Sequence, residues 1–100
     1  MRQDTKVLSK KIVLRGDLGV KRMEEIKANL LAELYVQQKL HITITEVSSL
    51  HLSSLQWIYA FSCAAQTEGK EVMISTNLPA RFDLLVKASG LKKMFNRFDH

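Results

Sequence analysis

This 100-residue sequence has few of the residues from which reactive sites are commonly built. It contains one cysteine, Cys63, one proline and four glycines. A single cysteine excludes an intrachain disulfide and a multi-cysteine metal site, which suits a reducing cytosol. The sequence also has no glycine-rich phosphate loop, no paired carboxylates at a catalytic spacing and no set of zinc ligands. We therefore expect a protein that is not an enzyme and that has no catalytic residues, metal site or cofactor.

Segments that direct a chain into a membrane are missing as well. The longest nearly apolar run, from Leu55 to Ala65, is too short to cross a bilayer and is interrupted by Gln56 and Ser62. Residues 1–4 do not provide the apolar core of a signal peptide. These absences predict a cytoplasmic protein without a membrane span.

The positive charges do not form a nucleic-acid-binding pattern. The formal net charge is +5, but the lysines and arginines are spread along the chain and are not interleaved with aromatic residues, which make up 7% of the sequence. A platform for single-stranded nucleic acid requires both features together. We expect no nucleic acid as a partner, and the excess of positive charge favours acidic protein partners.

Strand and helix patterns alternate along a length that suits one domain. Residues 5–8, 11–15, 42–47 and 71–75 have the pattern of strands, the first two joined at Ser9-Lys10, and a short final helix is predicted over 91–95. Helices are predicted to begin near Val20, Ser53 and Pro79. The order β-β-α-β-α-β-α predicts a single α/β domain over residues 1–100, with helices packed on a mixed sheet of about four strands.

The strand patterns also predict which side chains form the core. Apolar residues alternate with polar ones in the predicted strands, so that one face of the sheet should be apolar. The predicted core residues are Ile12, Leu14, Ile42, Ile44, Val72 and Ile74.

The most informative stretch is the turn between the strand at 42–47 and the next helix, His51-Leu52-Ser53-Ser54. Backbone N–H groups at a helix start are unpaired and carry partial positive charge, which favours an anion or an acidic group of a partner. Ser53 and Gln56 also have the spacing of a capping box, which is a purely structural interpretation of the serine.

Other side chains around this turn have two interpretations each. Trp57 and Tyr59 give the helix more large apolar side chains than one buried stripe requires, so they either pack on a neighbouring helix or stay exposed as contact anchors for a partner. His51 has no Asp, Cys or second His nearby in sequence and is predicted to be a surface histidine rather than a general base. Cys63, in the middle of the helix, is predicted to be a small buried thiol.

The order of the elements and several short motifs resemble the STAS domains, the family of bacterial anti-sigma factor antagonists. Gly16-Asp17-Leu18 is similar to the family's Gly-acid-Leu turn, and residues 43–47 are similar to its Asp-Leu-Ser-x-Val strand. Residues 51–55 fall without a gap on its Asp-Ser-Ser/Thr-Gly-Leu motif, and Pro79 to Leu91 follow its final Pro…Gly-Leu pattern. The resemblance extends from about residue 11 to residue 95. It implies a protein-interaction module of bacterial signalling, with an anti-sigma kinase-like or other signalling protein as its partner.

The sequence departs from the family at the position that regulates binding. In partner-switching members, a serine after the conserved aspartate is phosphorylated, and the added charge breaks the complex. Here His51 takes the place of the aspartate and Leu52, which has no hydroxyl, takes the place of the acceptor serine. A one-residue gap would instead place Ser53 on the aspartate and Ser54 on the acceptor, so Ser54 and Ser53 are the possible phosphosites. We prefer the ungapped alignment, because the gap shortens the distance to Gly69.

Two functions follow from the resemblance. The first is an antagonist-like interaction module that is not phosphorylated at the usual serine. The second is a STAS-type nucleotide- or anion-binding regulatory subunit of a transport or chemotaxis-like assembly, with a phosphate at the helix start. The candidate partner- or anion-binding residues are the same for both: His51, Leu52, Ser53, Ser54 and Trp57.

Overall fold

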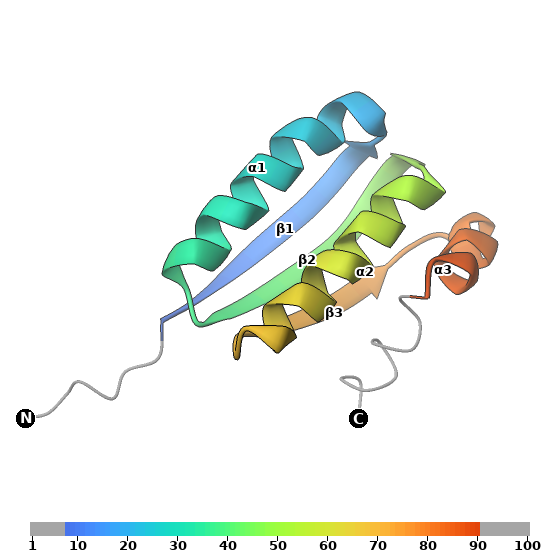
Figure 1. The fold of residues 1–100 in the computed structure, drawn as a ribbon. Coiled ribbons are helices and arrows are strands. Elements are labelled where there is room, and N and C mark those ends of the chain that lie inside the picture. Colours follow the sequence, from blue (N-terminus) through green and yellow to red (C-terminus); the bar gives the residue numbers. More distant parts are fainter. Residues whose placement is uncertain (1–7, 91–100) are drawn as a thin grey trace, which may run out of the picture.

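The computed structural model describes residues 8–90, in which strands and helices alternate from one end to the other (Figure 1). Both long helices lie on the same face of the sheet, and a short third helix packs beside the second. The elements are β1 (Ser9–Leu18), α1 (Val20–Val36), β2 (Lys39–Leu50), α2 (Leu52–Thr67), β3 (Glu71–Asn77), a 3-10 turn (Ala80–Phe82) and α3 (Asp83–Ser89).

The sheet has the order β1-β2-β3, and both pairs of neighbouring strands are parallel. Ile12, Ile42 and Ile74 are aligned across the three strands. Since side chains at every second position point to the same face, this register places the apolar residues of all three strands under the helices.

The core lies between that face and the two long helices. Five of the six predicted core residues are buried, and Ile12 is partly buried against them. The helices contribute Met23, Ile26 and Leu30 from α1 and Leu55, Ile58 and Phe61 from α2. The prediction of an α/β fold with an apolar sheet face is therefore confirmed.

The strand count and the strand directions differ from the prediction. The described residues form three strands rather than about four, and the sheet that they form is parallel rather than mixed. The predicted turn at Ser9-Lys10 is wrong, because these residues are the start of β1 and pair with Lys39 and Leu40. The Leu8 carbonyl accepts hydrogen bonds from the amides of Gln38 and Lys39. The residue before β1 is therefore already bonded to the residues at the start of β2. The predicted strand at 5–8, except for its last residue, and the predicted helix at 91–95 lie outside the described residues.

The helix starts are close to those predicted. α1 begins at Val20 as expected, and α2 begins at Leu52, one residue before Ser53. The third helical segment begins directly after Pro79 as a 3-10 turn and continues into α3, which ends at Gly90 with a φ of 89°. The one-residue shift of α2 matters for the site, since it changes the role of each serine in the turn.

Candidate functional site

Two turns meet at the carboxyl edge of the sheet. Because β1 and β2 are parallel and Leu18 is aligned with Leu50, the connections into α1 and α2 begin next to each other. The amide of Gly19 donates a hydrogen bond to Asp17 Oδ1 at 2.8 Å. A Cβ atom at Gly19 would lie 2.9 Å from that oxygen and 3.5 Å from the His51 ring. The predicted Gly-acid-Leu turn is the end of β1, and of the predicted turn at 51–54 only His51 lies outside α2, whose first turn contains the other three residues. The geometry brings these two segments into one surface, with His51 against Gly19.

Ser54 joins the two turns from the inside. Its Oγ donates a hydrogen bond of 2.7 Å to the carbonyl of Leu18, and the residue is 2% exposed. This bond fixes the first turn of α2 to the last residue of β1. The Ser54 hydroxyl therefore faces the interior of the protein rather than a partner.

Ser53 has the opposite environment. It is exposed, and the N-cap position of α2 belongs to His51, with no side-chain capping hydrogen bond. The predicted capping box of Ser53 and Gln56 is therefore wrong, because the helix begins one residue earlier than the box requires. The amides of Ser54 and Leu55 donate to the His51 carbonyl at 3.1 and 3.4 Å. Since the first amides of a helix have no intrahelical partner, those of Leu52 and Ser53 are left for an outside acceptor.

A small hollow lies between the first turns of α1 and α2. Its volume is ≈ 50 Å³, and Val20, Met23, Lys27, Ser53 and Ser54 line it. Lys27 Nζ is 3.8 Å from a carboxylate oxygen of Glu24 and 5.8 Å from the centre of the Trp57 ring. Val20 is 62% exposed at its rim. The hollow therefore combines helix-start donors, one lysine and an exposed apolar side chain.

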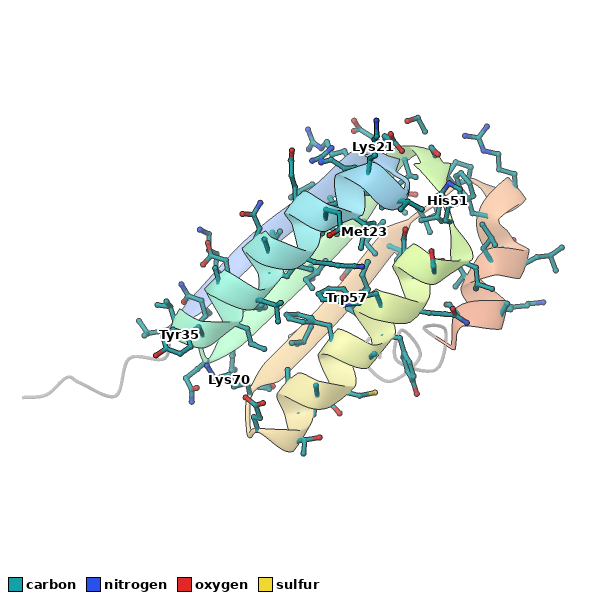
Figure 2. All side chains as sticks on the ribbon, turned by 45° about the horizontal axis from the view of Figure 1, so that its top comes forward. Lys21, Met23, Tyr35, His51, Trp57 and Lys70 are labelled. Carbon is teal, nitrogen blue, oxygen red and sulfur yellow. The ribbon has the colours of Figure 1, made fainter. Side chains whose placement is uncertain are left out.

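Trp57 fills the space between the two long helices, as Figure 2 shows. Its ring stacks on that of Phe61, with the ring centres 5.2 Å apart and the planes at 17°, and it is partly buried against the core. Tyr59 is also partly buried, and its ring atoms lie 3.8 Å from a Cβ built on Gly90 after α3. Of the two interpretations, packing on neighbouring helices is the one that the geometry supports for both residues.

The sequence did not indicate every residue of this surface. Gly19, Val20 and Lys27 belong to the connection after β1 and to α1, and the pairing of β1 with β2 brings them next to the start of α2. The available signal was topological, since connections from adjacent parallel strands emerge at one edge. Cys63, which was predicted to be buried, is exposed. It lies beside the exposed Ala64, and the core side of this stretch of α2 is made by Ser62 and Ala65.

Residues 8–90 contain neither a cluster of metal-ligating side chains nor a membrane-spanning helix. No group of three or more His, Cys, Asp or Glu side chains is arranged to hold a metal ion there. None of the helices in that range has both the length and the apolar character needed to cross a bilayer.

Comparison with known protein families supports the relation that the motifs suggested. Residues 1–96 match a family model described as "Mlab, STAS domain". A search of curated proteins gave no match. The matched region includes every element of the described structure, and with it both turns of the surface.

Proposed function

Because the chain belongs to the STAS domain family, we propose that it is a non-catalytic interaction module of bacterial signalling that resembles an anti-sigma factor antagonist. The family consists of regulatory and interaction domains, which supports the general role. The proposal adds the surface, the kind of partner and the mode of control.

The observation that carries the proposal is the exposure of Ser53 in the first turn of a helix whose first amides have no intrahelical partner. We define the turn surface as Val20, Lys27, His51, Leu52 and Ser53. It offers hydrogen-bond donors, the positive end of α2 and an apolar contact at Val20. A protein that supplies a carboxylate beside an apolar side chain would match all three. Trp57 packs between α1 and α2 next to this surface, and we do not assign it as the main contact residue for the partner.

The proposal includes control that does not depend on the usual phosphoserine. Leu52 has no hydroxyl, and the Ser54 hydroxyl is buried in its bond to Leu18, so a kinase would have to open the helix start to reach it. After incubation with the cognate anti-sigma kinase and ATP, we expect mass spectrometry to find residues 50–56 unmodified. Phosphate on Ser53 or Ser54 would contradict this and would restore a partner switch.

A protein partner is favoured over a nucleotide at this surface. Pockets for drug-sized ligands have volumes of about 300 Å³ or more. The hollow at Ser53 has a volume of ≈ 50 Å³ and suits a single acidic group rather than a base, a sugar and phosphates. A carboxylate side chain presented by another protein fits this size.

The test compares two variants that each add one negative charge. Ser53→Asp places a carboxylate on the turn surface, where it should repel an acidic group of the partner. The fold should persist, since Asp is favourable in the first turn of a helix. Gln38→Glu is the matched control, because Gln38 is exposed on the connection between α1 and β2 at the other end of the sheet.

The partner would be isolated by affinity capture with the wild-type protein, identified by mass spectrometry and then titrated in purified form. We expect Ser53→Asp to weaken its affinity by about tenfold, which corresponds to about 1.4 kcal/mol, and Gln38→Glu to leave it unchanged. Equal affinities of the wild type and Ser53→Asp would place the partner elsewhere on the domain.

A further inference from the structure

A second, separate cavity lies at the amino end of the sheet, at the edge opposite to the turn surface. It has a volume of ≈ 250 Å³, and its lining includes Ser9, Lys10, Lys11, Lys39, His41 and Met73. Most of these residues lie on the sheet face that points away from α1 and α2, and within residues 8–90 no helix covers that face. None of them belongs to the turn surface.

The cavity brings together more positive charge than its neighbours neutralise. Lys10 Nζ contacts a carboxylate oxygen of Glu33 at 2.7 Å, and Lys39 Nζ contacts one of Glu71 at 3.2 Å. Among the described residues, Lys11 has no carboxylate partner. The two carboxylates that contact these lysines are thus paired with Lys10 and Lys39, which leaves the charge of Lys11 without compensation among residues 8–90.

The strand register places the two lysines of the open face close to each other. Lys11 is directly opposite His41, and Lys39 is the next residue on the same face of β2. Neighbouring like charges on adjacent strands destabilise a sheet. His41 is held in place by a hydrogen bond of 2.9 Å between its Nε2 and Ser75 Oγ. A bound anion would relieve the repulsion between Lys11 and Lys39.

We propose that this cavity binds a phosphate group, either as the free ion or as a small monoester. Lys11 and Lys39 lie on the open face of the sheet and each carries three N–H donors, and Ser9 adds a hydroxyl, so a small anion with several acceptor oxygens fits best. The volume is below the range of about 300–1,000 Å³ found for drug-sized ligands, which agrees with a small ligand. Met73 gives one wall an apolar character that the organic part of a monoester could contact.

The first test is an NMR titration of the ¹⁵N-labelled protein with inorganic phosphate, and in parallel with glycerol phosphate, at constant ionic strength. Saturable shifts of the amides at 9–11 and 39–41 are expected. Tighter binding of glycerol phosphate would identify a monoester as the ligand, and equal or weaker binding the free ion. Shifts that grow without saturation, or that centre on residues 52–54, would overturn the proposal.

Two variants and a control make the test specific to the cavity. Lys11→Gln should weaken phosphate binding at least about tenfold, because it removes the uncompensated charge. Lys87→Gln, which removes an exposed lysine from α3, should change it less than about twofold. Glu71→Gln frees Lys39 from its carboxylate and should tighten binding. Equal effects of the two lysine variants, or weaker binding by Glu71→Gln, would contradict the proposal.

Thermal melting provides an independent test of phosphate binding. Phosphate should raise the Tm of the wild type, because a ligand that binds only the folded state stabilises it, and Lys11→Gln should lose most of this gain. Without phosphate, Lys11→Gln should melt no lower than the wild type, since it removes a repulsion. An equal phosphate gain in both proteins would overturn the assignment. The result is independent of the turn surface, so either proposal can fail without the other.

Discussion

At the scale of single residues, neighbouring serines in the same turn have different roles. Ser54 is buried and bonded to the Leu18 carbonyl, whereas Ser53 is exposed and makes no capping bond. We predict that Ser54→Ala lowers the free energy of unfolding by about 1–2 kcal/mol, because it leaves a buried carbonyl unsatisfied. Ser53→Ala should stay within about 0.5 kcal/mol of the wild type. Urea denaturation of both variants measures the difference, and equal effects would contradict the assigned roles.

Glu46 has a strained backbone conformation, which is a second effect at the scale of single residues. It is the only residue other than glycine with a positive φ among those described, at 50°, and it lies where the pairing of β1 with β2 is irregular, between Leu14 and Asp17. A side chain makes this left-handed conformation costly, by about 1–2 kcal/mol, whereas glycine adopts it freely. We predict that Glu46→Gly raises the free energy of unfolding by about 0.5 kcal/mol, after the greater freedom of glycine in the unfolded chain is subtracted.

The matched control is Glu46→Gln, which removes the charge but keeps the Cβ atom. It should have almost no effect on stability in the same denaturation experiment. If Glu46→Gly destabilises the protein, or if Glu46→Gln stabilises it equally, backbone strain is not the cause. Strain of this kind is often kept near functional sites, and the irregular pairing lies in the part of β1 and β2 that leads to the turn surface.

At the scale of elements, one ion pair connects β1 with the last turns of α1. The hydrogen bond from Lys10 lowers the pKa of Glu33 below its ordinary value of 4.5, although partial burial acts in the opposite direction. A carboxylate whose pKa is lower in the folded state stabilises the fold above its unfolded pKa. This contribution is lost as the pH falls through the lower, folded value.

We therefore predict that Lys10→Gln raises the pKa of Glu33 toward 4.5. NMR titration of the Glu33 side-chain carboxyl measures this directly. In the same variant, the loss of stability between about pH 5 and pH 3 should be smaller than in the wild type, because one lowered carboxyl has been removed. Lys21→Gln is a suitable control, since Lys21 is at the opposite end of α1 (Figure 2). An unchanged pKa in Lys10→Gln would show that the ion pair does not persist in solution.

The packing of α2 against α1 depends on Trp57. Because its ring is only partly buried, we predict that Trp57→Ala lowers the free energy of unfolding by about 2 kcal/mol, less than the roughly 3–5 kcal/mol typical of a fully buried aromatic. Trp57→Phe should cost less, since it keeps a ring that can stack on Phe61. Thermal melting combined with partner titration separates the roles. A variant that melts like the wild type but loses the partner would make Trp57 a contact residue.

At the scale of the whole molecule, local patterns predicted the elements, and nonlocal contacts decided their connections. The alternation of Ile42 and Ile44 is visible in six residues of sequence, and it identified β2 and its buried face, although β2 extends over Lys39–Leu50 rather than 42–47. The continuity of β1 through Ser9 and Lys10 is different, because it depends on pairing with residues 39 and 40. A polar dipeptide has the same local pattern in a turn and at the start of a strand.

The same distinction explains what could be predicted of the site. The family motifs pointed to residues 51–54, which form the start of α2 rather than a turn, and the strand order explains why they meet the end of β1 at residues 16–18. They did not give the direction of the two serine side chains, because the Ser54 hydroxyl finds its acceptor 36 residues away in the chain. A shift of one residue in the helix start moved Ser53 from the predicted cap position into the first turn of α2, where it is exposed. Site residues are thus harder to predict than the elements that carry them.

The arrangement of the whole fold predicts a gradient of local stability. β2 is the central strand, pairs on both sides and contributes Leu40, Ile42 and Ile44 to the core, each at most 1% exposed. α3 has seven residues at the rim, and its only fully buried residue is Ser89. We predict that amide hydrogen exchange is slowest at residues 40–44, where it requires global unfolding, and fastest among the helices at 83–89, where local opening suffices. Exchange measured by mass spectrometry tests this order. If α3 exchanged as slowly as β2, its contacts with α2 would be part of the cooperative core, and removing them should unfold the sheet as well.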